Sequence, residues 1–323
     1  MNNIAISVSG LKKRYDEVQA IADMTFDLYR GELFGFLGPN GAGKTTTINI
    51  LTGLARPDAG TIRIEGIDCI AKPRAAQNLI GVVPDESNLY PELTGYENLC
   101  FCATLYGINK KERIKRAKLL LESFRLLDAA HRKFGTYSKG MKRKLTIAAG
   151  IIHQPQILFL DEPTTGIDVA SARQIRQLIA DLHDQGTTIF LTTHYIEEAE
   201  RFCDRIAFVV NGRIVRTDTV ENLIQPLQDK SIMHFSFKGS STLMPDILQN
   251  DFPDSKFNLL SKGELRVESS QPIKVGKLIR YLEEQELEVT EAKKIQPSLE
   301  DIFVEITGIE ADMMRKEKLR GNQ

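Results

Sequence analysis

The sequence predicts an α/β fold with a mostly parallel sheet, followed by a small α+β domain. Between residues 157 and 210, apolar or β-branched runs alternate with helical segments, an order typical of parallel strands joined by crossover helices. A strand-like run at 32–37 enters a glycine-rich loop that opens a helical segment. From about residue 221 the pattern changes to short strands and separate helices. We therefore expect two domains, which the length of 323 residues allows.

The elements of the first domain follow from the spacing of its apolar residues. Alternating or β-branched runs predict strands at 4–8 and 22–29, with a polar turn at 15–17 between them. We expect a helix from 44 to about 54, a strand at 61–66 and mostly helical structure from about 94 to 150. The remaining expected elements are a strand at 157–160, a helix at 169–183, a strand at 187–193, a helix at 195–202 and a strand at 205–210.

The second domain begins after a predicted hairpin. Asn211-Gly212 between two β-rich runs favours a type I′ turn at the closing edge of the first domain, residues 1–219. Residues 220–310 predict a small domain with the order βαββαβ, and 311–323 a charged tail. The elements expected there are a strand at 232–237, a short helix near 242–249, strands in FNLL and LRVES around a turn at 262–264, a helix at 274–285, a strand at 287–291 and a helix at 298–306.

The overall amino-acid composition argues against several classes of function. Lys and Arg number 42 against 43 Asp and Glu, giving a formal net charge of −1, so we expect no nucleic acid as a partner. Cys69, Cys100, Cys102 and Cys203 show neither metal-binding spacing nor disulfide density, which favours buried thiols in a reducing compartment. The N-terminus lacks a signal peptide, and no apolar run is long enough to span a bilayer. A membrane role would need another chain to cross the bilayer.

The glycine-rich loop has the pattern of a phosphate-binding loop. GPNGAGKTT fits G-x-x-x-x-G-K-[ST] directly after a strand and at the start of a helix. In such a loop the backbone N–H groups converge on phosphate oxygens, the lysine reaches the β and γ phosphates, and the following hydroxyl ligates Mg²⁺. The sequence therefore predicts a P-loop for a nucleoside triphosphate with Mg²⁺, formed by Gly38, Pro39, Asn40, Gly41, Ala42, Gly43, Lys44, Thr45 and Thr46.

Two adjacent carboxylates end a strand that is apolar throughout. ILFL at 157–160 runs into Asp161 and Glu162, and the C-terminal ends of parallel strands are where open α/β sheets bind ligands. We expect Asp161 to hold Mg²⁺ directly or through water. Glu162 points elsewhere in an extended chain, where it would orient or deprotonate the attacking water.

With these motifs placed, residues 1 to about 219 resemble the ATPase subunit of an ATP-binding cassette (ABC) transporter. YSKGMKRK at 137–144 is similar to the family's signature LSGGQ, with Lys139 in place of a glycine and Met141 in place of the glutamine. ILFLDE matches the family's Walker B pattern. The other matching positions are Ser138 and Gly140 of the signature, Gly166-Ile167-Asp168 as the D-loop, His194 as the switch histidine and Tyr15 as the aromatic that stacks on adenine. This combination in this order is specific to ABC proteins.

The resemblance implies a fold, a dimer and residue roles. The fold is that of a P-loop NTPase ABC cassette, with a parallel-sheet core, an antiparallel β subdomain and a helical subdomain at about 88–150. Two copies sandwich two ATP molecules, so that Ser138 and the Gly140 N–H reach the γ-phosphate of the partner's nucleotide, at a helix start that favours an anion. His194 contacts the γ-phosphate, Asp168 belongs to the nucleotide-binding residues, and Lys44, Glu162 and His194 form the catalytic set.

One position departs from the family pattern. Where most members have the Q-loop glutamine, GVVPDESNLYP has Asp85. Carboxylates are suitable ligands for Mg²⁺, which makes Asp85 a candidate metal ligand; alternatively it stabilises a turn after Pro84. In the family this segment and the helical subdomain receive a coupling helix of the membrane subunit. The apolar anchors expected for that contact are Leu89, Tyr90, Leu93 and Tyr96, although internal packing is an equal interpretation for Leu93.

The C-terminal part indicates the direction of transport. PSLEDIFVEITG at 297–308 is similar to the ending of ATPases from bacterial exporters that pair with a separately encoded permease. We therefore expect a cytoplasmic ATPase that homodimerises and energises an integral membrane permease, attached through it to the inner face of the cell membrane, with ATP and Mg²⁺ as cofactors. The alternatives are a soluble ABC ATPase that acts on ribosomes or nucleic acid, and an ATP-dependent regulator that does not hydrolyse ATP.

Overall fold

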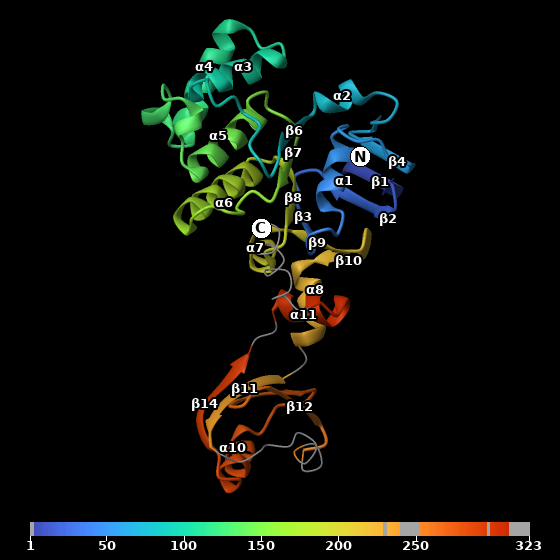
Figure 1. Cartoon of the computed structure of the whole chain (residues 1–323). Coiled ribbons are helices and arrows are strands. Elements are labelled where there is room, and N and C mark those ends of the chain that lie inside the picture. The colour runs from blue at the N-terminus through green and yellow to red at the C-terminus, as the bar shows by residue number, and fades with distance from the viewer. Residues whose placement is uncertain (1–2, 229–230, 240–247, 249–251, 296–297, 310–323) are drawn as a thin grey trace. The chain divides into compact units, whose positions relative to one another are not determined.

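The computed structural model describes residues 3–228, 231–239, 248, 252–295 and 298–309. The chain divides into two compact units (Figure 1). The first contains the residues up to Thr219 together with 306–309, and the second runs from Val220 to Glu305.

The first unit is built on a ten-stranded mixed sheet in the order β5-β4-β1-β2-β10-β9-β3-β8-β7-β6. Its parallel part pairs β3 with β8 and β9, and β7 with β8 and β6. Strands β1, β2, β4 and β5 pair antiparallel beside it. The strand bounds are β1 Ile4–Tyr15, β2 Val18–Tyr29, β3 Leu33–Leu37, β4 Ala59–Ile64, β5 Ile67–Asp68, β6 Ile80–Val83, β7 Ile157–Asp161, β8 Thr188–Thr193, β9 Arg205–Val210 and β10 Arg213–Thr219.

Helices cover both faces of the parallel strands. Figure 1 shows α1 on one side of β3, β8 and β7, and α5 and α6 on the other, with α3 and α4 gathered at one end of the unit. This arrangement confirms the predicted layers of an ABC cassette. The helices are α1 Lys44–Leu51, α2 Pro73–Gln77, α3 Gly95–Leu105, α4 Lys110–Ser123, α5 Lys139–Ile151, α6 Val169–Asp184 and α7 Ile196–Phe202, with short 3₁₀ turns at Leu127–Ala129 and Phe134–Thr136.

The packing of the first unit explains why the sequences of its central strands are continuous apolar runs. All five residues of β3 and all five of β7 are buried, as expected for strands covered on both faces. Phe190 of β8 packs against Phe36 at 5.2 Å and Phe159 at 5.5 Å between ring centroids. Strands β3 and β7 flank β8 in parallel, so their C-terminal ends, where the P-loop and the paired carboxylates begin, lie at the same edge of the sheet.

Some strands and helices begin or end at other residues than the sequence predicts, because contacts with distant segments set their ends. Strand β1 continues to Tyr15 and β2 already begins at Val18, because the two strands pair up to that point. Helix α1 ends at Leu51, and Gly53 adopts a φ of +79°. Asn211 and Gly212 have φ values of +49° and +71° between the antiparallel β9 and β10, which confirms the predicted hairpin.

The second unit contains a four-stranded antiparallel sheet in the order β12-β13-β11-β14. Its strands are β11 Ser231–Lys238, β12 Ser255–Ser261, β13 Glu264–Ser269 and β14 Glu288–Ile295, and its helices are α8 Val220–Gln228, α10 Val275–Glu284 and α11 Leu299–Thr307. Leu278 and Leu282 of α10 pack with Phe235 and Leu265 of the sheet. Apart from residue 248, the helix expected near 242–249 lies outside the described residues, and so does the charged tail.

Two further findings concern the helices. Sequence reasoning missed α8, because a proline at position 226 argues against a helix there. In the part of the chain that the structure describes, no helix is both long and apolar enough to cross a membrane.

Candidate active site

The P-loop lies between β3 and α1, and close packing requires its glycines. Gly43 has a φ of +100°, and a methyl group there would lie 2.5 Å from the Ala20 carbonyl oxygen. A methyl group on Gly38 would lie 2.1 Å from the carbonyl oxygen of Val209. The loop is therefore pressed against β2 and β9, which fixes the backbone that opens helix α1.

Lys44 is buried at the start of α1 and is held by the loop that it follows. Its Nζ donates to the Gly38 carbonyl at 2.7 Å and to the Pro39 carbonyl at 3.1 Å. The same ammonium lies 3.4 Å from Oε1 of Glu162. The structure thus brings the predicted phosphate-binding lysine and one of the paired carboxylates together.

The two adjacent carboxylates have different hydrogen-bond partners, and Glu162 has an unusual backbone conformation. Asp161 ends β7 and accepts a hydrogen bond from Thr192 Oγ1 at 2.5 Å. Glu162 has a φ of +48°, in the left-handed region that non-glycine residues rarely adopt and that is frequent at functional sites. The expectation of an extended chain at Glu162 is therefore wrong, although the two carboxylates do have different partners.

Glu162 is the centre of a buried hydrogen-bonded cluster. His194 Nδ1 lies 2.6 Å from Glu162 Oε2, and Thr165 Oγ1 donates to the same oxygen at 2.8 Å. Burial alone would raise the pKa of Glu162, but the bond to His194, the charge of Lys44 and the Thr165 hydroxyl together hold it below its usual value. The carboxylate stays ionised at neutral pH, as a general base must.

A cavity of about 390 Å³ opens in front of the P-loop. Tyr15 borders it beside the loop, and Lys13 Nζ lies 5.0 Å from the centre of the Tyr15 ring. Two lining residues on β2, Val18 and Ala20, escaped sequence reasoning because no motif marks them. The lining residues are Tyr15, Val18, Ala20, Asn40, Gly41, Gly43, Lys44, Thr45, Thr46, Asp85 and Glu162.

The oxygen donors around this cavity suit a cation that is bound together with phosphate. Thr45 and Asp85 line the cavity, and Asp161 lies one residue before Glu162. Among the described residues no group of three or more His, Cys, Asp or Glu side chains is arranged to hold a metal. The Thr45 hydroxyl and the Asp85 carboxylate fit Mg²⁺, which proteins commonly bind through one or two oxygen side chains plus substrate phosphates.

Three predicted site residues lie away from this cavity and form a second cluster. Ser138 caps helix α5 by accepting from Met141 N at 3.3 Å, and Asp168 caps α6 by accepting from Ser171 N at 2.9 Å. A methyl group on Gly140 would lie 2.2 Å from Ser171 Oγ, so the starts of the two helices are in close contact. Ser138, Gly140 and Asp168 do not line the cavity of their own chain.

A buried arginine that no motif identified connects helix α5 to the site. Arg143 Nη1 donates to the Pro84 carbonyl, and Nη2 donates to the Asp85 carbonyl. Nη2 also lies 3.4 Å from Asp85 Oδ1 and 3.5 Å from the Glu162 carbonyl. Burial lowers the pKa of Arg143, and the carboxylates of Asp85, Asp161 and Glu162 partly offset that effect.

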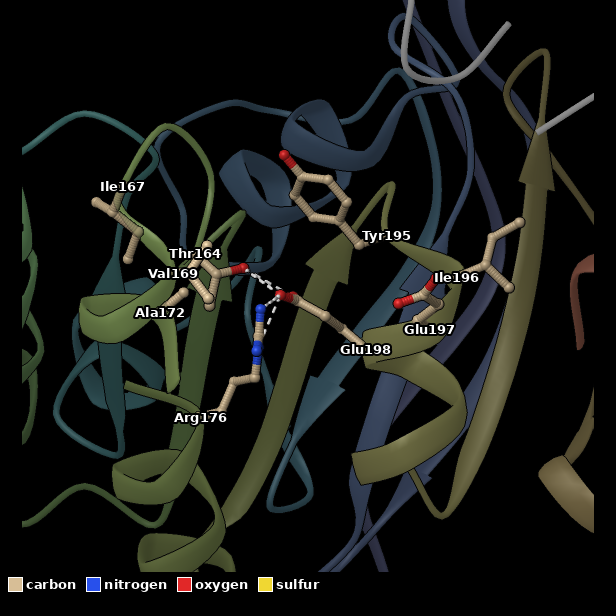
Figure 2. A pocket seen from close by; sticks show the side chains of 9 residues that line it. All are labelled: Thr164, Ile167, Val169, Ala172, Arg176, Tyr195, Ile196, Glu197 and Glu198. Carbon is tan, nitrogen blue, oxygen red and sulfur yellow. Dashed lines mark hydrogen bonds and ion pairs between the residues drawn. The ribbon is translucent and has the colours of Figure 1, made fainter. Parts of the chain in front are cut away.

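A second buried carboxylate that sequence reasoning missed joins the segments after β7 and β8. Glu198 of α7 accepts from Thr164 Oγ1 at 2.7 Å and forms an ion pair with Arg176 of α6 at 2.8 Å. Figure 2 shows these three side chains meeting in a pocket of about 300 Å³, which Tyr195 also borders. Glu198 thus ties the helix after His194 to the helix after Asp168.

The residues expected to contact a membrane subunit differ in exposure, and Leu93 and Tyr96 are partly buried. Leu89 is buried and therefore does not belong to the surface. Tyr90 is exposed, and its ring meets Phe101 of α3 edge to face at 5.1 Å. Leu105, one turn further along α3, is 69% exposed. We call Tyr90, Phe101 and Leu105 the α3 patch; sequence reasoning found only Tyr90 of it.

Comparisons with known proteins identify the family. The model of the family described as ABC transporter matches residues 21–165. The chain is 36% identical over 313 residues to the doxorubicin resistance ATP-binding protein DrrA of Mycobacterium tuberculosis, covering 95% of this chain and 94% of the relative. It is 42% identical over 219 residues, 68% of each chain, to the Nod factor export ATP-binding protein I of Ralstonia nicotianae.

A solved structure gives the same result for the fold. The dimeric, post-hydrolysis form of the ATP-binding cassette MJ0796 with ADP and Pi matches with a TM-score of 0.61 and 27% identity, covering 67% of this chain and 98% of that one. The resemblance inferred from the sequence motifs is thereby confirmed. The chain belongs to the family of ABC transporter ATP-binding subunits and is an ATP hydrolase.

Proposed function

We propose that this chain is the ATP-hydrolysing subunit of an exporter and drives a separately encoded membrane permease. The names of the relatives support this proposal, since one is a doxorubicin resistance protein and another a Nod factor export protein. The chain would work at the inner face of the cell membrane, attached through the permease. The permease, not this chain, would select the transported substrate.

The observation that carries the proposed chemistry is the cluster of Glu162, His194 and Lys44 at the edge of the P-loop cavity. Lys44 would exchange its loop carbonyl partners for the β and γ phosphates of ATP. Glu162 would accept the proton of the attacking water, and His194 would hold that carboxylate in place and contact the γ-phosphate. The left-handed backbone at Glu162 keeps this side chain with Lys44 and His194.

Magnesium is the cation that we propose for this site. Thr45 and Asp161 would hold it, and Asp85 is the third candidate ligand. When bound, Mg²⁺ would neutralise charge on the β and γ phosphates. The short bond from Thr192 fixes the Asp161 carboxylate in one orientation, which favours a preorganised ligand.

We also propose that the working state is a homodimer that closes on ATP. Ser138 and Gly140 lie at the N-terminus of α5, a position that favours an anion, and do not line the cavity of their own chain. They would contact the γ-phosphate bound by the partner, with Asp168 of the D-loop also at the nucleotide and Tyr15 stacked on adenine. The dimeric form of the similar cassette supports this arrangement.

The α3 patch is the proposed contact for the permease. Its exposed apolar and aromatic side chains suit a helix that docks in a groove. The 88–150 segment would serve as the helical subdomain, and residues 220–310 as an accessory domain. We propose no catalytic role for that domain.

Co-purification from native cells tests the transporter proposal. The Glu162→Gln variant would be trapped with MgATP and used as bait in detergent, because loss of the base should prolong the ATP-bound closed state. We expect a polytopic membrane protein in near-equal amount, and less of it with a Glu162→Gln bait that also carries Phe101→Ala and Leu105→Ala. Recovery of ribosomal or DNA-associated proteins instead would contradict the proposal and favour a soluble ABC ATPase.

A further inference from the structure

Arg143 is placed where the second turn of α5 meets the loop after β6. It follows Ser138 by five residues on the helix that the signature motif opens. Only 7% of its side chain is exposed. Burying a guanidinium is costly unless its donors are paired, and Arg143 directs both terminal nitrogens at one short segment, Pro84 and Asp85.

The surrounding contacts make this junction tight. Ser87 Oγ and Thr146 Oγ1 lie 2.7 Å apart, which adds a second polar link one helical turn beyond Arg143. A methyl group on Gly81 would lie 2.2 Å from the Gly150 carbonyl oxygen. Helix α5 and residues 81–87 are therefore in close contact along their length, and a shift of α5 must move this segment.

The same segment borders the nucleotide cavity. Asp85 lines it together with Lys44 and Glu162, and its side chain is 48% exposed. A carboxylate at this place adds negative charge close to where triphosphate would bind, and opposite charge from Arg143 reduces that effect. If Arg143 only filled space, its guanidinium would not need to contact both the backbone and the carboxylate of one residue, Asp85.

We propose that Arg143 is a positioning residue that couples the signature helix to the nucleotide cavity, by fixing the Pro84–Asp85 backbone and by balancing the Asp85 carboxylate. The inference rests on the proposed role of the cavity in nucleotide binding. It gives Asp85 a defined partner, Arg143, while Asp85 also remains a candidate metal ligand. It also means that the helix opened by Ser138 is linked through Arg143 to the nucleotide cavity of its own chain.

The first test is made without nucleotide. Hydrogen–deuterium exchange of residues 84–88 is compared in the wild type, Arg143→Gln, Arg143→Lys and the exposed control Arg173→Gln. We expect faster exchange in Arg143→Gln, a smaller increase in Arg143→Lys because the charge remains but the planar fork is lost, and no change in Arg173→Gln. Unchanged exchange of 84–88 in a folded Arg143→Gln protein would overturn the positioning role.

The second test is a double-mutant cycle on the binding of a non-hydrolysable ATP analogue with Mg²⁺. Arg143→Gln is measured in the wild-type background and with Asp85→Asn. We expect the loss of affinity to be at least about threefold smaller with Asp85→Asn, as for residues in contact, because the carboxylate that Arg143 balances is then absent. Equal losses in both backgrounds would overturn the charge-balancing role.

Failure of this inference can be told apart from failure of the proposed function. The exchange experiment needs no nucleotide, so it reports on the α5 junction even if the cavity binds something else. Turnover of Glu162→Gln tests the catalytic proposal without touching Arg143. If Arg143→Gln does not fold, Arg143→Lys replaces it in the exchange experiment, with the same expected direction, and the uncharged Arg143→Met replaces it in the cycle with Asp85→Asn.

Discussion

The two units of the chain use their buried residues differently. In the first unit Lys44, Arg143, Glu162, His194 and Glu198 are all buried. Among the described residues of the second unit, Ser269 is the buried polar residue, and the core consists of aliphatic and aromatic side chains. Since burying charge costs stability, the contrast indicates that the first unit carries the chemistry.

The charges of the second unit lie at its periphery, where they form pairs that are partly exposed. Arg266 lies 2.8 Å from Asp301 and 2.9 Å from Glu268. The first unit has exposed pairs too, such as Arg14 with Glu17, but it also contains the deeply buried pair of Lys44 with Glu162. Substitutions in the two units should therefore affect different properties, and the following predictions test that difference.

The largest expected change in stability comes from the apolar core of the second unit. Leu282→Ala removes a fully buried side chain of α10 and should lower the free energy of unfolding of that unit by about 2–5 kcal/mol. Chemical denaturation of the full chain measures it, with the exposed Leu260→Ala as control. A cost for Leu282→Ala no larger than for the control would contradict the assignment of α10 to the core.

A smaller change in stability, with a loss of nucleotide binding, is expected from Gly38→Ala. The new methyl group would collide with the Val209 carbonyl, so we expect about 1–3 kcal/mol of destabilisation and weaker binding of ATP. Gly276→Ala is the matched control in α10, where nothing lies within 4 Å, and alanine there should be neutral or stabilising. Equal effects of both substitutions would refute the tight P-loop packing.

The smallest effect should come from the peripheral pair and depend on pH. Burial would raise the pKa of Asp301, but the Ser298 backbone N–H and the Arg266 guanidinium hold it below its ordinary value. A carboxyl group whose pKa is lowered on folding stabilises the protein above its unfolded pKa, and that contribution is lost as pH falls through the folded pKa.

Asp301→Asn should therefore destabilise the second unit by about 1–2 kcal/mol at pH 7, with the difference shrinking below about pH 4. Unfolding by denaturant at several pH values measures it. The same change at the exposed Asp254 serves as the control. A penalty for Asp301→Asn that is constant down to pH 3 would exclude the ion pair as its cause.

The sequence predicted best what depends on local pattern. The P-loop, the carboxylates after an apolar strand and the Asn211-Gly212 hairpin each combine a short motif with a defined neighbouring element, and their positions in the structure agree. The alternation of strands and helices was sufficient to predict the parallel sheet. The motifs also identified the family, which the comparisons confirmed.

What the sequence did not predict depends on contacts between distant segments. Arg143 and Glu198 follow known motifs by only a few residues, yet their partners at Asp85 and Arg176 come from other elements. The left-handed backbone at Glu162 is accompanied by hydrogen bonds from its N–H to the carbonyl and hydroxyl of Thr192 on the neighbouring strand. Phe101 and Leu105 form a surface with Tyr90 only because α3 packs beside that loop.

The most direct test of the central claim is the ATP turnover of Glu162→Gln with Mg²⁺ present. The account predicts a fall of at least about 100-fold, as expected for loss of a general base, with ATP still bound. Glu122→Gln, the same change at an exposed position of α4, should leave turnover unchanged. Turnover of Glu162→Gln within about threefold of the wild type would contradict the assignment of Glu162 as the base.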